Sequence, residues 1–320
     1  MSIQQRVHPP SVESAMTSLF PGASWNAEPL DGGMTNRNYR VDVLLEDSST
    51  KTFVVQEQLP GELAKRVGIK RENQFQALKQ VAGLGLAPEV VFHDPVAGTV
   101  VVEYVHGKLI REVDDRRTAI THVARLLSAF HGATRGATLE GFVSDPYHGT
   151  LWLYDQVQRS APGLAAEFRW AIEVVERIRR SRGSYERSLC HADVSDGNVI
   201  ITPQRAVLID WEYVGAGDPY YDLADFAEKA QLSESEEHAL VAEYDGGVES
   251  GSMALVRVYR FVSMLREGLW SVQAGSTGFI DFDHASYADE CLSRMTAIAE
   301  NPTFGDYVAA IHTSTIGAAR

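Results

Sequence analysis

The sequence predicts an α+β fold with two lobes, a small antiparallel-sheet lobe over residues 1–106 and a larger helical lobe over residues 107–320. Segments with the apolar pattern of strands dominate before residue 106, whereas apolar residues recur at helical spacing after it. One apolar hairpin, formed by Val199–Ile201 and Ala206–Ile209, is embedded in the helical part. A chain of 320 residues is long enough for both lobes to share a sizeable core.

The elements of the first lobe are delimited by glycine and proline. The expected elements are a helix over 11–19, strands over 38–45 and 51–59, a helix over 70–81, and strands over 90–92 and 99–104. Asp31-Gly32-Gly33 is expected to be a turn. Glycines at such a turn let backbone N–H groups close over phosphates, although an ordinary hairpin tip explains the same residues.

The second lobe is expected to be helical apart from the hairpin. Helical spacing covers residues 118–131, 151–182 with an interruption at Pro162-Gly163, 221–229, 233–242, 254–270 and 284–298. Between the lobes, Glu103-Tyr104-Val105 is expected to cross over, with backbone groups of Glu103 and Val105 facing an adenine ring. An ordinary core strand is the alternative interpretation of this segment.

The overall charge limits the kinds of partner. The net charge is −14, with 43 acidic and 29 basic residues. Nucleic acids and anionic membranes bind clustered Lys and Arg, so neither is an expected partner, whereas a small cationic substrate is compatible. Only two cysteines are present, and no signal-peptide pattern or long apolar stretch occurs, so a cytoplasmic location is expected. Nothing in the sequence indicates an oligomeric state.

The hairpin predicts a metal site. Asn198 lies just before its first strand and Asp210 just after its second, so antiparallel pairing would bring the two backbones to within about 5 Å of each other. Asp193 lies in the loop that enters the same end. Carboxylate and amide oxygens are ligands that Mg²⁺ prefers. We therefore expect Asn198 and Asp210 to hold Mg²⁺.

The same stretch predicts phosphoryl transfer from ATP. If Asn198 and Asp210 hold the metal, Asp193 is free to accept the proton of an attacking hydroxyl group. The spacing His-x-Asp-x-x-x-x-Asn from His191, followed by an apolar hairpin and Asp210, is that of the kinase catalytic loop and its metal-binding aspartate. These features together predict a bilobal protein-kinase-like fold. The alternative is a polar turn before a surface hairpin.

Beyond this pattern, residues 30–297 resemble the choline/ethanolamine kinase family, within the aminoglycoside-phosphotransferase-like small-molecule kinases. The stretches that carry the resemblance are Gly32–Tyr39, His191–Asn198, Ile209–Tyr213 with Gly217–Pro219 and Asp222–Ala224, and Gly268–Gln273 with Asp281–Asp283. The resemblance implies an ATP- and Mg²⁺-dependent kinase that phosphorylates the hydroxyl group of a small amine-bearing alcohol.

The resemblance also implies roles for individual residues. Thr35 and Asn36 would cover the phosphates, and Asp193 would contact the substrate as the base. His191 and Asp222 would support the catalytic loop. The residues matched to the amine pocket are Tyr213, Asp225, Glu267 and Trp270. Aromatic faces and carboxylates suit an ammonium group, and Glu267 stands where the family usually has a tryptophan, which favours an amine that carries N–H groups.

One departure from the family concerns the nucleotide. Gln58 stands where the family places a cation for the phosphates, and Gln74 stands where it places the partner glutamate. Loss of both charges together is structurally coherent, because neither leaves a buried charge unpaired. We expect weaker ATP binding or a heavier reliance on Mg²⁺. Gln56 could take the same place if the register is shifted by two residues.

Two alternative functions stay open at this point. The first is a kinase of another small hydroxylated substrate, such as an aminoglycoside or a thiamine-like compound. The second is a nucleotide-binding pseudokinase, suggested by Gln58 and Gln74. Retention of Asp193, Asn198 and Asp210 argues against the second alternative.

Overall fold

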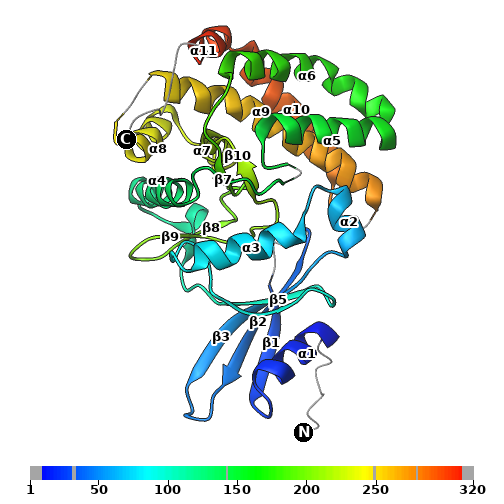
Figure 1. Ribbon diagram of the computed structural model, residues 1–320, viewed down its shortest axis with the longest axis vertical. Helices are drawn as coiled ribbons and strands as arrows, with labels where there is room; N and C mark the ends of the chain where they lie inside the picture. Colours follow the sequence, from blue (N-terminus) through cyan, green and yellow to red (C-terminus); the bar gives the residue numbers. More distant parts are fainter. Residues whose placement is uncertain (1–8, 31–33, 142, 248–249, 279, 312–320) are drawn as a thin grey trace.

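The computed structural model describes residues 9–30, 34–141, 143–247, 250–278 and 280–311. A sheet flanked by helix α1 occupies one end of the molecule, and a larger group of helices occupies the other end (Figure 1). The predicted α+β fold is confirmed, and the boundary near residue 106 stays a prediction. None of the described helices has the length and apolar content needed to cross a membrane.

The five-stranded sheet is antiparallel throughout. Its spatial order is β1 (Ser24–Leu30), β2 (Arg37–Leu44), β3 (Thr50–Glu57), β5 (Thr99–Glu103) and β4 (Val90–Asp94). Side chains alternate between the two faces of a strand, and Val41, Val43, Phe53 and Val55 form a core with Met16 of helix α1 (Pro10–Leu19). Strand β1 was not predicted, because only one of its side chains, a small alanine, is buried.

Helices account for most of the remaining chain. Their bounds are α2 (Gly61–Arg66), α3 (Arg71–Ala82), α4 (Arg116–Ala133), α5 (Pro146–Ser160), α6 (Pro162–Arg182), α7 (Pro219–Lys229), α8 (Glu234–Asp245), α9 (Ser250–Thr277), α10 (His284–Glu300) and α11 (Phe304–Ala310), with a short 3₁₀ turn η1 (Ile110–Glu112). The short helices α2 and α11 were not predicted from the sequence. Helix α3 lies between the sheet and the larger group of helices (Figure 1).

Helix α9 is the central helix of the larger lobe. Helices α5, α7 and α10 pack against it, and Leu255, Tyr259, Val262, Leu265 and Leu269 are completely buried. A helix that is apolar on most of its circumference is stable only inside a protein. Polar residues late in α9 are therefore held in place by packing on several sides.

The predicted hairpin is present as β8 (Val199–Ile201) and β9 (Ala206–Leu208), and β6 (Lys108–Leu109) adds a third strand. Val199 pairs with Leu208, and the backbone N–H of Ile209 donates to the carbonyl of Asn198 at 3.0 Å. This register places Asn198 and Asp210 at the same end of the hairpin. A second small sheet pairs β7 (Ser188–Cys190), which leads into the catalytic loop, with β10 (Gly215–Gly217).

Candidate active site

Two cavities meet at the end of the hairpin. The helical-side cavity, about 310 Å³, is lined by residues that include Asp193, Tyr213 and Trp270. The sheet-side cavity, about 320 Å³, is lined by strand residues and by the segment that joins the lobes. Gly197, Asn198 and Asp210 line both cavities. A group that passed from a molecule in one cavity to a molecule in the other would therefore pass Asn198 and Asp210.

A buried carboxylate holds the catalytic loop from below. Asp222 of α7 is completely buried and accepts hydrogen bonds from the backbone N–H groups of His191, at 2.7 Å, and Ala192, at 2.9 Å. Ala192 has a φ of 61°, a conformation that is unfavourable for residues other than glycine. The two hydrogen bonds help to stabilise this strained turn, as predicted for a supporting residue.

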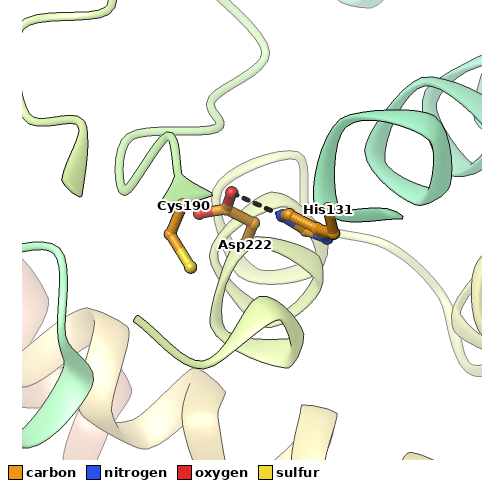
Figure 2. Close-up of side chains that lie close together, drawn as sticks. All are labelled: His131, Cys190 and Asp222. Carbon is orange, nitrogen blue, oxygen red and sulfur yellow. Dashed lines mark hydrogen bonds and ion pairs between the residues drawn. The ribbon is translucent and has the colours of Figure 1, made fainter. Parts of the chain in front are cut away.

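Figure 2 shows Asp222 beside Cys190 and His131, a group of potential metal ligands. His131 Nε2 lies 3.0 Å from Asp222 Oδ2, and its Nδ1 lies 2.9 Å from the hydroxyl group of Tyr244. Burial, followed by the charge of Asp222, raises the pKa of the Cys190 thiol well above its usual range, so the thiol stays protonated. Because the imidazole and the carboxylate already have protein partners, we assign this cluster a structural role.

His191 connects the catalytic loop to the strand that precedes Asp210. Its Nε2 lies 2.9 Å from the carbonyl oxygen of Ile209, and its ring packs edge-on against Trp211. Burial lowers the pKa of His191, which keeps the ring neutral and able to donate from Nε2 to that carbonyl. This geometry fits the bracing role that the sequence predicts.

The three residues predicted for base and metal lie together. Asn198 Nδ2 donates to Asp193 Oδ2 at 2.9 Å, which leaves the amide oxygen of Asn198 free for a cation. Asp210 has a φ of 64°, and within the described part of the chain its buried Oδ1 has no hydrogen-bond partner. Burial raises the pKa of Asp210 well above its usual range, and the charges of Glu212 and Asp193 raise it further. An unpaired carboxylate beside a free amide oxygen fits Mg²⁺.

Sequence reasoning missed Glu212. Its buried carboxylate accepts hydrogen bonds from the Thr35 hydroxyl group and, at 3.0 Å, from Asn36 Nδ2. Burial raises the pKa of Glu212 to about 7, although these two hydrogen bonds oppose the shift. Glu212 therefore ties the predicted phosphate-covering residues to the segment that carries Asp210. The glycines of the predicted turn, residues 32 and 33, lie outside the described residues. The signal in the sequence was a carboxylate two positions after Asp210.

The predicted amine-pocket residues divide into two groups. Tyr213, Glu267 and Trp270 line the helical-side cavity with Asp193. Asp225 is completely buried, is not among the residues that line this cavity, and accepts hydrogen bonds from the backbone N–H of Val194, at 2.8 Å, and the hydroxyl group of Ser263, at 2.6 Å. Its position does not support the predicted contact with substrate, because the loop and α9 occupy its oxygens.

Lys229, at the end of α7, was not predicted to take part in the site. Its Nζ lies 2.6 Å from Asp193 Oδ1, 3.2 Å from Asp225 Oδ2 and 3.1 Å from Glu267 Oε1. Burial alone would lower the pKa of Lys229, but the three carboxylates more than offset this effect and raise the pKa well above its usual range. In turn, Lys229 and Arg266 outweigh the effect of burial on Asp193 and lower its pKa, so Asp193 is ionised.

The sheet-side cavity is lined by two of the residues predicted to meet a nucleotide, whereas Thr35 lines the helical-side cavity. Glu103 and Val105 line it, as do Gln56 and Gln74. Gln58 is not among the lining residues, and its Nε2 donates to Gln74 Oε1 at 2.7 Å. The two glutamines are therefore partners, as the joint loss of a cation and its partner glutamate would require, and Gln74 is the member that borders the cavity.

The family model described as "Phosphotransferase enzyme family" matches residues 26–258. The chain therefore belongs to this family, which is a family of small-molecule kinases. Among curated proteins, Protein LicA of Haemophilus influenzae is 26% identical over 221 residues, which cover 67% of this chain and 61% of that protein. Probable choline kinase 3 of Arabidopsis thaliana is 22% identical, covering 83% of this chain and 84% of that protein.

Solved structures support the same fold. A choline/ethanolamine kinase family protein from Mesorhizobium loti has a TM-score of 0.77 at 23% identity and covers 95% of this chain and 100% of its own. A structure described as LicA in complex with AMP has a TM-score of 0.68 at 23% identity and covers 90% of this chain and 97% of its own. The predicted kinase-like fold and family resemblance are both confirmed.

Substitution of Asp222 by alanine should strongly destabilise the fold. It leaves two buried backbone N–H groups without acceptors, each costing about 1–3 kcal/mol. We expect the free energy of unfolding to fall by about 3–5 kcal/mol in urea titrations. The matched control is Asp155→Ala, because Asp155 makes an exposed ion pair with Arg159 at 2.7 Å, and such pairs contribute about 0–1 kcal/mol. Equal stability of the two variants would contradict the bracing role of Asp222.

Substitution of Asp210 by asparagine should separate the metal site from the fold. Removing the charge of a half-buried carboxylate whose Oδ1 has no partner among the described residues should leave the metal-free protein at least as stable as wild type. Thermal unfolding with and without MgCl₂ measures the metal effect, which reaches about 2.7 kcal/mol at a hundredfold excess over the Kd. We expect this stabilisation in wild type and in the control Asp196→Asn, a partly exposed carboxylate, but not in Asp210→Asn. A Mg²⁺ effect that survives in Asp210→Asn would place the metal elsewhere.

Proposed function

We propose that the protein transfers the γ-phosphoryl group of ATP to the hydroxyl group of a small alcohol, in the presence of Mg²⁺. The observation that carries the proposal is the wall shared by the two cavities, where Asn198 and Asp210 border both and Asp193 lies on the helical side. Family membership and a relative's structure described as a complex with AMP support a nucleotide on the sheet side. We also propose a cytoplasmic location, which the supply of ATP and two free cysteines support.

The residues of the loop divide the chemistry between them. Asp193 is ionised and accepts the proton of the alcohol. Asn198 orients the Oδ2 atom of Asp193 by donating a hydrogen bond to it. Asn198 and Asp210 would hold Mg²⁺, which neutralises charge on the phosphates when it is bound. Thr35 and Asn36 are positioned through Glu212 next to the same wall, where they would cover the phosphates. The remaining helical-side residues select and orient the alcohol.

The class of alcohol is the finer part of the proposal. The resemblance predicts an amine-bearing alcohol, and relatives named choline kinase support this class. Relatives named thiamine kinase keep a thiamine-like substrate as the alternative. Retention of Asp210, whose buried Oδ1 has no hydrogen-bond partner among the described residues, disfavours a pseudokinase, because a buried unpaired oxygen is costly unless a cation binds it. The contacts of Lys229 with three carboxylates, argued below, count against the cationic members of this class.

Replacement of Gln58 by lysine together with Gln74 by glutamate should strengthen ATP binding. The two side chains already touch, so the double variant places an ion pair where a hydrogen bond of 2.7 Å exists. We expect the ATP Kd, measured by calorimetry at fixed Mg²⁺, to fall by about tenfold, since a bond to a charged group is worth about 1.5–3 kcal/mol. Gln74→Glu alone leaves a buried charge unpaired and should mainly destabilise the fold. An unchanged ATP Kd in the double variant would show that these residues do not serve the nucleotide.

Substitution of Asp193 by asparagine tests the reaction itself. General base catalysis contributes about 10²–10⁴-fold, so alcohol-dependent ADP release should fall by that factor, while ATP affinity stays within about twofold of wild type. Ser195→Ala is the control, because Ser195 lines the same cavity but has no expected role in proton transfer. If wild type binds ATP but releases no ADP with any alcohol of a broad panel, the pseudokinase interpretation replaces this proposal.

A further inference from the structure

The carboxylates that could attract a cationic substrate already contact a cation of the protein itself, Lys229. Lys229 Nζ contacts Asp193, Asp225 and Glu267 at distances between 2.6 and 3.2 Å. An ammonium group has three N–H donors, and each has an acceptor here. The Lys229 side chain is only 8% exposed. It therefore lies in the position of a bound ammonium ion, within the cavity that the substrate must enter.

Glu267 is occupied from several sides. Besides Lys229, its carboxylate accepts from Arg266 Nη2, at 2.9 Å, and from the hydroxyl group of Tyr287, at 3.1 Å. The negative charges of Asp225 and Glu267 are balanced by the positive charges of Lys229 and Arg266, all four of which are buried. Asp193 then keeps its negative charge and can accept the proton of the alcohol. Three negative and two positive charges at the floor of the helical-side cavity thus leave one net negative charge, that of Asp193.

Among the described residues, three of the four unpaired polar groups at this cavity are donors, and the fourth is Oδ1 of Asp210, at the expected Mg²⁺ position. Within the residues that the structure describes, Trp270 Nε1, Arg266 Nη1 and the Tyr213 hydroxyl group are buried without hydrogen-bond partners, and all three residues line the helical-side cavity. Indole and guanidinium N–H groups can only donate, and a phenol can donate. Buried donors without acceptors are costly, so this lining favours a molecule that brings oxygen acceptors rather than further N–H groups.

The geometry points to Lys229 as the residue that sets substrate specificity, by filling the cation subsite itself. The acceptor alcohol would then carry no fixed positive charge, and its own oxygen atoms, from hydroxyl or carboxylate groups, would pair with the donors of the cavity. This inference rests on the proposed phosphotransferase function and reverses the expectation of a cationic substrate.

An external amine would compete poorly for this subsite. Lys229 is tethered to α7, so it needs no association from solution, whereas an external ammonium loses translational freedom when it binds. Displacing Lys229 would also leave a second positive charge nearby, and like charges brought together at a desolvated site repel each other strongly. Arg266 adds to this repulsion, because its positive charge already contacts Glu267. The guanidinium group also lies 5.3 Å from the ring centre of Tyr221.

Matched alcohols test the inference on wild-type protein. Choline and its uncharged isostere 3,3-dimethylbutan-1-ol differ only in charge, and ethanolamine is compared with ethylene glycol and with 3-hydroxypropionate. We expect kcat/KM for ADP release to favour the uncharged or anionic member of each pair by at least about tenfold. The last two compounds distinguish neutral from anionic acceptors. A preference of wild type for choline or ethanolamine would overturn the inference while leaving the kinase function intact.

Removal of the lysine gives a second test. Lys229→Ala leaves three carboxylates around a space the size of an alkylammonium ion. We expect it to reverse the preference toward choline, and we expect added propylammonium to restore activity on the uncharged alcohols. The double variant Lys229→Ala with Glu267→Gln removes one charge of each sign, so it preserves the balance and protects the fold, and rescue should be weaker in it. Lys79→Ala, an exposed lysine beside Phe75, is the control and should behave as wild type.

Binding measurements keep the two proposals separable. If no alcohol supports ADP release, the proposed function fails, and thermal shifts still test the cation subsite. We expect choline and propylammonium to stabilise Lys229→Ala more than wild type. Equal or greater stabilisation of wild type by these cations would show that Lys229 does not occupy their site.

Discussion

The active site depends on one buried charge, the carboxylate of Asp222. Its two oxygens accept the backbone N–H groups of His191 and Ala192, and one of them also meets His131 (Figure 2). A carboxylate in the interior is costly unless each oxygen is hydrogen-bonded, so helix α7 and the catalytic loop can form only together. Ala192 has a positive φ, which is strained for a residue other than glycine, and the hydrogen bonds to Asp222 stabilise this strained turn.

Two further carboxylates, those of Asp225 and Glu212, position residues on opposite sides of the site. Asp225 holds the backbone of Val194 from α7, and Glu212 holds Thr35 and Asn36 from the sheet lobe. The two lobes therefore meet through side chains that also surround the predicted metal position. Because half-buried Asp210 and buried Glu212 both have raised pKa values, a cation between the lobes would relieve electrostatic cost on each of them.

The predictable part of this site is the part encoded locally. The spacing from His191 to Asn198 and the apolar hairpin after it place Asp193, Asn198 and Asp210 by backbone geometry alone, so one stretch of sequence is sufficient. Strand β1 and the pair β7–β10 escaped prediction because their pairing is long-range and their segments are short, polar or glycine-rich. The helix boundaries differed by a few residues for the usual reason, that ends fray and caps vary.

The character of the substrate cavity could not be predicted, because its charge depends on contacts between distant segments. Read singly, Asp193, Asp225 and Glu267 describe an acidic pocket for a cation. Lys229 reverses that interpretation, and the sequence offers only a weak sign of it: a lysine four residues after Asp225 on one helix face. Its contact with Glu267 arises because α7 packs against α9, which sequence spacing does not encode. The selectivity of such a pocket therefore follows from which of its charges are already paired, and counting its acidic residues overestimates its attraction for an amine.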